Sequence, residues 1–188
     1  RVLLVGLGKE RDFHEKAYRD TIATATKTLR DTGSMDAVIT LSEIPVRKRD
    51  ITWNIEQAVI SAHEALYRFV TMKSKPDETR RPLKRVTFAV SRRGELKFGE
   101  VGLARGLAIA HGIDLAKDLG NTPSNICTPE YLAAEAQKMA KAHGFGCEVL
   151  DQAACEKLAM GSFLSVGKGS NKPPRFIVLR HEGGAKGE

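Results

Sequence analysis

Two glycine-rich stretches resemble loops that bind the phosphates of nucleotides. In the first, residues 161–170, five residues separate Gly161 from Gly167, and Gly169 follows Lys168. A P-loop has four residues in that gap and a Ser or Thr after the lysine, because the hydroxyl binds the Mg²⁺ that accompanies the phosphates. Both positions differ, so we exclude ATP binding at this stretch.

The second stretch, Gly6-Leu7-Gly8-Lys9, follows an apolar run that predicts a buried strand over residues 2–7. The dinucleotide fingerprint GxGxxG needs a third glycine three residues after the second, where this chain has Arg11. The simpler interpretation is a strand that leaves the sheet through a glycine turn.

Residue types that bind metals are present but scattered. His111 and Asp114 lie three residues apart on an expected helix and could face each other, yet no second pair completes a metal site. The three cysteines, Cys127, Cys147 and Cys155, are odd in number and lack a CxxC spacing. This pattern disfavours a disulfide framework or a zinc knuckle, and it predicts a cytoplasmic location.

The charge of the chain is uneven. The net charge is +7, and the window from Arg47 to Arg93 contains twelve Lys or Arg against five Asp or Glu, which accounts for all of it. Three interpretations stay open: a duplex-DNA surface, a solvated face, and a contact with an acidic surface elsewhere. The residues we predict for DNA binding are Arg47, Lys48, Arg49, Arg80, Arg81, Lys84 and Arg85.

The chain has 188 residues, 41 % of them hydrophobic, which suits one large domain or one domain plus part of another. No apolar run approaches the roughly 20 residues that span a bilayer, and no signal-peptide pattern occurs, so we expect no membrane partner. An apolar run follows Arg1 at once, and the chain stops soon after the run 176–179. We therefore expect an internal piece of a longer protein.

Expected strands and helices alternate, which predicts an α/β fold with mostly parallel strands. Asp12, Asp50 and Thr128 are predicted helix N-caps. The expected helices cover residues 12–30, 51–72, 99–119, 129–143 and 152–158, and the expected strands cover 2–7, 36–41, 86–90, 147–150 and 176–179.

Residues 117–129 separate the long expected helix from the next one. Gly120 and Asn121 are predicted to end the first helix, and two prolines bias Thr122 and Thr128 towards extended backbone. The stretch is either a domain junction or an ordinary loop between two helices.

Residues 118–129, DLGNTPSNICTP, resemble the junction of the leucyl (cytosol) aminopeptidase family. Residues 160–170, MGSFLSVGKGS, with Pro173-Pro174-Arg175 and the strand after them, resemble a second segment of that family. Residues 31–35 and 80–83 are similar to its bacterial PepA-type members. The similarity covers nearly the whole chain.

The resemblance implies a macro-domain-like N-terminal α/β domain over residues 1–97, with its first strands missing and a mainly parallel sheet flanked by helices. It implies a linker helix over 98–120 and the first elements of the catalytic domain over 121–188. Enzymes of this family are typically homo-hexamers that remove N-terminal residues, often leucine, from peptides. They use two divalent ions (Mn, Zn or Mg), which would activate a bridging water and stabilise the tetrahedral charge.

The family's metal and catalytic residues lie in GKGxTFDxGG-type and NTDAEGR-type motifs, and neither occurs in this chain. Residues 166–169 match the first only in part, because Ser170-Asn171-Lys172 follows without an Asp. We therefore assign no catalytic residue and no metal ligand, Lys168 included, and expect no cofactor in this piece.

The resemblance implies the non-catalytic front part of a bacterial leucyl aminopeptidase, inactive by itself. Two alternatives belong to other classes. One is a DNA-binding regulator, because some PepA-type enzymes also bind DNA. The other is an ADP-ribose-binding macro-like domain, which only fold analogy supports.

Overall fold

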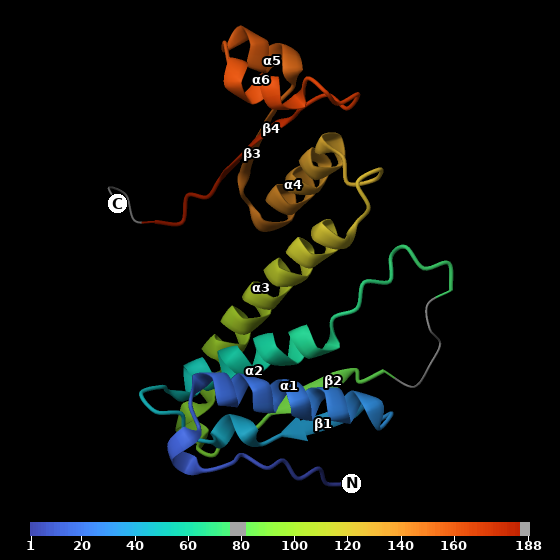
Figure 1. Cartoon of the computed structure of the whole chain (residues 1–188). Coiled ribbons are helices and arrows are strands. Elements are labelled where there is room, and N and C mark those ends of the chain that lie inside the picture. The colour runs from blue at the N-terminus through green and yellow to red at the C-terminus, as the bar shows by residue number, and fades with distance from the viewer. Residues whose placement is uncertain (76–81, 185–188) are drawn as a thin grey trace. The chain divides into compact units, whose positions relative to one another are not determined.

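The computed structural model describes residues 1–75 and 82–184, which form two compact units divided after Asp118 (Figure 1). The first unit, Arg1–Asp118, contains three long helices and a two-stranded parallel sheet. Its helices are α1 (Glu15–Asp31), α2 (Ile51–Leu66) and α3 (Leu96–Asn121). The last three residues of α3 belong to the second unit. The strands are β1 (Asp36–Ile39) and β2 (Arg85–Phe88), and the short 3-10 helices are η1 (Glu10–Asp12), η2 (Leu41–Glu43) and η3 (Arg93–Glu95).

The core of the first unit lies between the sheet and the helices α1 and α2, which pack against each other. Strands β1 and β2 pair in parallel, with Asp36 opposite Arg85 and Ile39 opposite Phe88. The buried cluster consists of Tyr18, Ile22, Ile39, Val46, Ala58 and Ala62. A small parallel sheet flanked by helices is therefore confirmed for this unit.

The helix starts follow local hydrogen bonding. Asp50 caps α2 as predicted, because its carboxylate accepts a hydrogen bond of 2.9 Å from the Trp53 backbone N–H. The prediction of Asp12 as the cap of α1 is wrong. Asp12 belongs to η1, and the His14 side chain accepts instead from the Ala17 N–H at 3.4 Å.

Two further predictions fail in this unit. Residues 2–7 form no strand: Val2 and Leu4 are 88 % and 90 % exposed, and no backbone hydrogen bond pairs this segment with other described residues. Apolar composition favours a strand, but a strand also needs a partner to pair with. Helix α2 ends at Leu66, not near residue 72. The backbone of Tyr67 is not helical, and its hydroxyl donates to Asp118 on α3 at 2.8 Å.

Helix α3 packs on α2 through glycines. A Cβ atom at Gly102 would overlap the backbone oxygen of Thr52, and one at Gly106 would lie 2.8 Å from the backbone oxygen of Glu56. Gly112, by contrast, has no such neighbour within 4 Å. Gly102 and Gly106 therefore let the backbones of α2 and α3 touch.

Helix α3 is longer at both ends than predicted. It begins at Leu96, and it continues through Gly120 and Asn121, which were expected to end it. A glycine weakens a helix, but it does not end one unless the backbone there adopts a left-handed conformation. Gly120 has a helical conformation in this chain.

The second unit, Leu119–Glu188, contains helices and a separate antiparallel sheet. Thr128 caps its first helix, Pro129 is the first helical residue and Gly144 ends it in a left-handed conformation, as the sequence rules for caps predict. The elements are α4 (Pro129–His143), β3 (Gly146–Leu150), α5 (Gln152–Lys157), α6 (Gly161–Gly167) and β4 (Phe176–Arg180).

The prediction of mostly parallel strands is wrong for this sheet. Strands β3 and β4 are antiparallel, with Leu150 opposite Phe176 and Gly146 opposite Arg180. Helices α5 and α6 therefore leave and rejoin the sheet at the same end, whereas a parallel pairing needs a crossover to the other end. Alternation of strands and helices in a sequence does not distinguish these two routes.

None of the helices in the described part of the chain has both the length and the apolar composition that a membrane span requires.

Gly102→Ala tests the contact between α2 and α3. We expect it to lower the free energy of unfolding by about 1–3 kcal/mol, because the new methyl group meets backbone that cannot move aside easily. The matched control, Gly112→Ala, should raise stability by up to about 1 kcal/mol, because alanine is the better helix former where space is open. Urea unfolding followed by the fluorescence of Trp53, the only tryptophan, measures both. Equal stability of the two variants would contradict the packing described.

Candidate functional site

The basic residues predicted as one surface are divided between the two ends of the sheet in the first unit. Arg47, Lys48 and Arg49 follow the carboxyl end of β1, whereas Lys84 and Arg85 lie at the amino end of β2. The Lys84 backbone N–H donates to Met35, just before β1, at 2.7 Å. Arg80 and Arg81 lie outside the described residues.

The basic residues at the two ends of the sheet differ in whether an acidic side chain already neutralises their charge. Arg49 forms an ion pair with Glu15 at 2.6 Å, and its guanidinium lies 5.3 Å from the centre of the Trp53 ring. Arg85 lies 3.8 Å from the Asp36 carboxylate. Arg49 and Arg85 are thus partly neutralised, whereas Arg47 and Lys48 are exposed and form no ion pair with other described residues.

Two cations from α1, one of which (Lys16) pairs with Asp20, complete a surface that the sequence prediction missed. Lys16 and Arg19 line one shallow depression together with Arg47 and Lys48, and these four residues are called the basic patch here. Lys16 and Arg19 lie three positions apart, so they share one face of α1. That spacing was the available signal, but nothing in the sequence placed this face next to residues 47 and 48.

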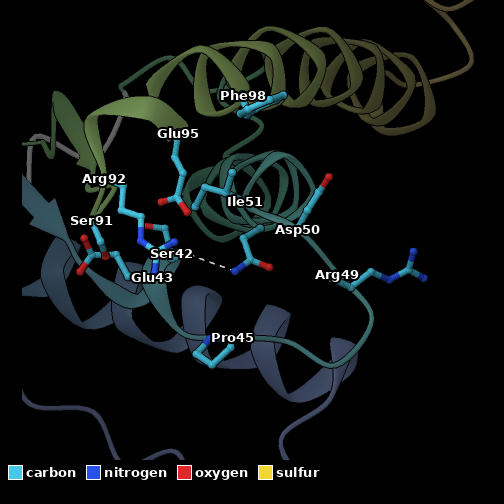
Figure 2. Close-up of a pocket in the computed structure, with 11 residues that line it drawn as sticks. Ser42, Glu43, Pro45, Arg49, Asp50, Ile51, Ser91, Arg92, Glu95 and Phe98 are labelled. Carbon is cyan, nitrogen blue, oxygen red and sulfur yellow. Dashed lines mark hydrogen bonds between the residues drawn. The ribbon is translucent and has the colours of Figure 1, made fainter.

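A cavity of about 560 Å³ opens beyond the carboxyl ends of β1 and β2 (Figure 2). Its walls come from η2 and the following loop, from the first turn of α2, and from η3 with the start of α3. The lining residues are Ser42, Glu43, Pro45, Arg49, Asp50, Ile51, Asn54, Ser91, Arg92, Glu95 and Phe98. In open α/β sheets this edge is where ligands usually bind, because the strands end there and loops diverge.

A buried hydrogen-bond chain holds the inner wall of this cavity. The Tyr18 hydroxyl donates to the backbone oxygen of Asn54 at 2.8 Å. The Asn54 side-chain NH₂ donates to the backbone oxygens of Ser42 and Ile44, each at 3.0 Å. The Ser42 hydroxyl then donates to the backbone oxygen of Ala89 at 2.7 Å. Helices α1 and α2, the η2 loop and the end of β2 are thereby joined through buried polar groups.

Burial also raises the pKa of Tyr18, the first residue of this hydrogen-bond chain. Tyr18 is fully buried, and desolvation of its anionic form raises the pKa of the phenol well above its usual range. The hydroxyl therefore stays protonated, as its role as a hydrogen-bond donor requires.

Two histidines of the first unit, His63 on α2 and His111 on α3, lie close together. His63 Nδ1 lies 3.6 Å from Asp114 Oδ2, and the rings of His63 and His111 meet edge to face with centres 5.7 Å apart. The sequence suggested His111 beside Asp114, whereas the structure places His63 against Asp114. Across residues 1–75 and 82–184, no group of three or more His, Cys, Asp or Glu side chains could hold a metal ion.

The glycine-rich stretch of the second unit is helical. Residues 161–167 form α6, and Lys168, which follows it, is exposed. Phe163 on this helix packs edge to face on Phe176 of β4, with ring centres 5.3 Å apart. The stretch therefore serves to pack α6 on the sheet.

Comparison with known families gives two matches in chain order. The N-terminal domain of the cytosol aminopeptidase family matches residues 1–76, and the catalytic domain of the same family matches residues 114–188. The chain belongs to the cytosol aminopeptidase family. The resemblance seen in residues 118–129 and 160–170 is thus confirmed.

Bacterial members of the cytosol aminopeptidase family match over the whole chain. The probable cytosol aminopeptidase of Dechloromonas aromatica is 53 % identical over 188 residues, which are 100 % of this chain and 38 % of that protein. That of Chromobacterium violaceum is 52 % identical over 183 residues, 97 % of this chain and 35 % of that protein. The chain therefore spans less than two fifths of the length of these relatives.

A solved structure of a related enzyme has the same fold. The bottromycin maturation enzyme BotP in complex with Mn matches with a TM-score of 0.81 at 25 % identity, over 95 % of this chain and 36 % of that one. The match to the catalytic domain of the cytosol aminopeptidase family begins at Asp114, on α3 and beside His63.

Tyr18→Phe tests the hydrogen-bond chain. The unfolded chain loses the Tyr18 proton above about pH 10, whereas the folded chain keeps it, so this group lowers the stability of the unchanged protein as the pH rises further. The variant lacks that effect but also lacks the hydrogen bond, which should cost about 1 kcal/mol below about pH 9. We expect this deficit to shrink above about pH 10 in urea unfolding followed by Trp53 fluorescence. A deficit that is constant with pH would contradict the shifted pKa.

Proposed function

We propose that this chain is the non-catalytic front part of a longer aminopeptidase, which removes N-terminal residues, often leucine, from peptides. The observation that carries the proposal is the ordered match to the family's N-terminal domain and then to the first part of its catalytic domain. Identity of 53 % to a probable cytosol aminopeptidase over the whole chain supports it. The family name also supports a cytoplasmic location.

The proposed domain organisation is a macro-domain-like N-terminal domain over residues 1–97, a linker helix over 98–120 and the start of the peptidase domain over 121–188. The division of the structure into two units after Asp118 supports a boundary in this region. The continuous helix α3 supports the linker. A homo-hexamer is proposed for the whole enzyme on family resemblance alone.

Two divalent ions (Mn, Zn or Mg) are proposed as cofactors of the whole enzyme, and the Mn complex of BotP supports this. Such ions supply a nucleophilic water at neutral pH and stabilise the charge on the tetrahedral intermediate. The described side chains of this chain do not fit a two-metal site, because none of them form a group of three donors. No catalytic step is therefore assigned to them.

An activity assay on two preparations tests the enzyme proposal. Protein captured from the source cells with an antibody against residues 1–188 should release leucine from a leucyl peptide. Chelation should abolish this release, and added Mn²⁺ should restore it. The recombinant 188-residue chain should release none under the same conditions.

The two preparations decide separate claims. If captured protein of verified mass is inactive with Mn²⁺, Zn²⁺ and Mg²⁺, the aminopeptidase proposal is wrong. If the pure recombinant chain releases leucine in a metal-dependent way, its non-catalytic role is wrong.

A second proposed function is binding of duplex DNA. The observation that favours it is the basic patch, in which Arg47 and Lys48 are joined by Lys16 and Arg19 from a different element. The other residues predicted from the sequence, Arg49, Arg80, Arg81, Lys84 and Arg85, remain part of the proposal. Contacts between cations and phosphates would make such binding fall steeply with salt.

The double variant Arg47→Glu, Lys48→Glu tests the DNA proposal. We expect affinity for duplex DNA to fall by at least about tenfold and the slope of log K against log salt to become shallower by about 2. The control Lys141→Glu, Lys157→Glu makes the same change in net charge on exposed residues of the second unit. Equal affinities of the two double variants, measured by fluorescence anisotropy, would rule out the basic patch as the contact surface.

A further inference from the structure

The cavity beyond β1 and β2 has no part in the two functions proposed above, yet it has the features of a built site. Its volume of about 560 Å³ lies within the usual range for small-molecule sites. Ser42, which lines it, is completely buried, and Asn54, which also lines it, is 5 % exposed. The hydrogen bonds of these two residues hold the surrounding loops in place before any ligand arrives.

Asn54 has one polar atom that the described protein does not satisfy. Both hydrogens of its NH₂ group are used, on the backbone oxygens of Ser42 and Ile44, and these two bonds fix which end of the amide is nitrogen. Its Oδ1 atom is buried and has no hydrogen-bond partner among the described residues. A buried acceptor without a donor is unfavourable, but this oxygen is too deeply covered for a group in the cavity to reach it in the present conformation.

The charged side chains around the cavity are not equally available. Arg49 is paired with Glu15, and in Figure 2 it points away from the other labelled side chains. Asp50 is occupied as the cap of α2. Glu43, Glu95 and Arg92, by contrast, form no side-chain hydrogen bond or ion pair with any other part of the chain that the structure describes.

The available charged groups are thus two carboxylates and one guanidinium. Negative charges outnumber positive ones, which suits a ligand with one cationic N–H group and a single anionic group. Figure 2 shows Arg92 and Glu95 extending from η3 towards Ser42 and Ile51. Pro45, Ile51 and Phe98, which is 48 % exposed, supply apolar surface beside these polar groups.

We propose that this cavity binds a free apolar α-amino acid. Its ammonium group is held by Glu43 and Glu95, and its carboxylate is held by Arg92. Its side chain packs on Pro45, Ile51 and Phe98. The inference does not depend on peptidase activity of this chain or of a longer protein.

The same charges disfavour a phosphate ligand. The two phosphates of ADP-ribose would meet Glu43, Glu95 and Asp50, with Arg92 as the one available guanidinium among the described lining residues. Like charges in a partly closed space repel strongly, because solvent screens them poorly. The cavity thus differs in charge from what a macro-like ADP-ribose site would need.

Calorimetric titration of the 188-residue chain with four compounds tests the ligand class. L-Leucine should bind saturably. N-acetyl-leucine lacks the ammonium group and leucinamide lacks the carboxylate, so each should bind at least about tenfold more weakly. ADP-ribose should not bind. The proposal is wrong if leucine shows no binding up to its solubility limit, if N-acetyl-leucine binds as well as leucine, or if ADP-ribose binds and leucine does not.

Two variants place the binding in this cavity. Glu95→Gln should weaken leucine binding by at least about tenfold, and Arg92→Gln should do the same for leucine but leave leucinamide unchanged, because the amide makes no use of the guanidinium. The controls are Arg93→Gln and Glu100→Gln, exposed neighbours that do not line the cavity.

Trp53 fluorescence verifies that each variant is folded. If the controls weaken leucine as much as their partners, or if Arg92→Gln weakens leucinamide equally, the cavity is not the site.

Discussion

The first unit depends on the two hydrogen bonds that the Asn54 side chain donates to Ser42 and Ile44. Asn54 lies in the first turn of α2, and the two carbonyl groups belong to the loop that connects β1 to that helix. A loop of this length has many possible paths, and burial of its backbone groups is tolerated only when they are paired. With Tyr18 donating to Asn54 from α1 and Ser42 donating to Ala89 after β2, one buried chain fixes four segments.

This arrangement explains why the cavity exists at all. The loops after β1 and β2 are joined at the core by the hydrogen bond from Ser42 to Ala89, and their outer parts form walls of the cavity. Charged residues on those outer parts are then free of intramolecular partners over much of the described lining. A cavity whose walls are fixed by the core requires little rearrangement to accept a ligand, which favours binding.

The sequence was sufficient for features that depend on neighbouring residues. Thr128, Pro129 and Gly144 predicted both ends of α4, and Asp50 predicted the start of α2, because caps are local hydrogen-bond arrangements. Long-range features were not predictable in the same way. Just after the end of α2, Tyr67 contacts Asp118, which is 51 residues away in the sequence. The direction of β4 depends on where α5 and α6 return the chain, and a strand over residues 2–7 would need a pairing partner. The basic patch and the cavity likewise combine residues from separate elements, and no spacing in the sequence encodes that proximity.

Both described sheets have only two strands, and this has a consequence for how the chain behaves at high concentration. Each strand has a row of backbone N–H and C=O groups on its outer edge, and such rows pair readily with strands of other molecules. Val38 on β1 is 70 % exposed, so apolar surface adjoins one of these edges. Short strands and nearby charges such as Asp36 and Arg85 restrain such pairing. In the isolated chain, the outer edges of these two small sheets are therefore sites for pairing between molecules.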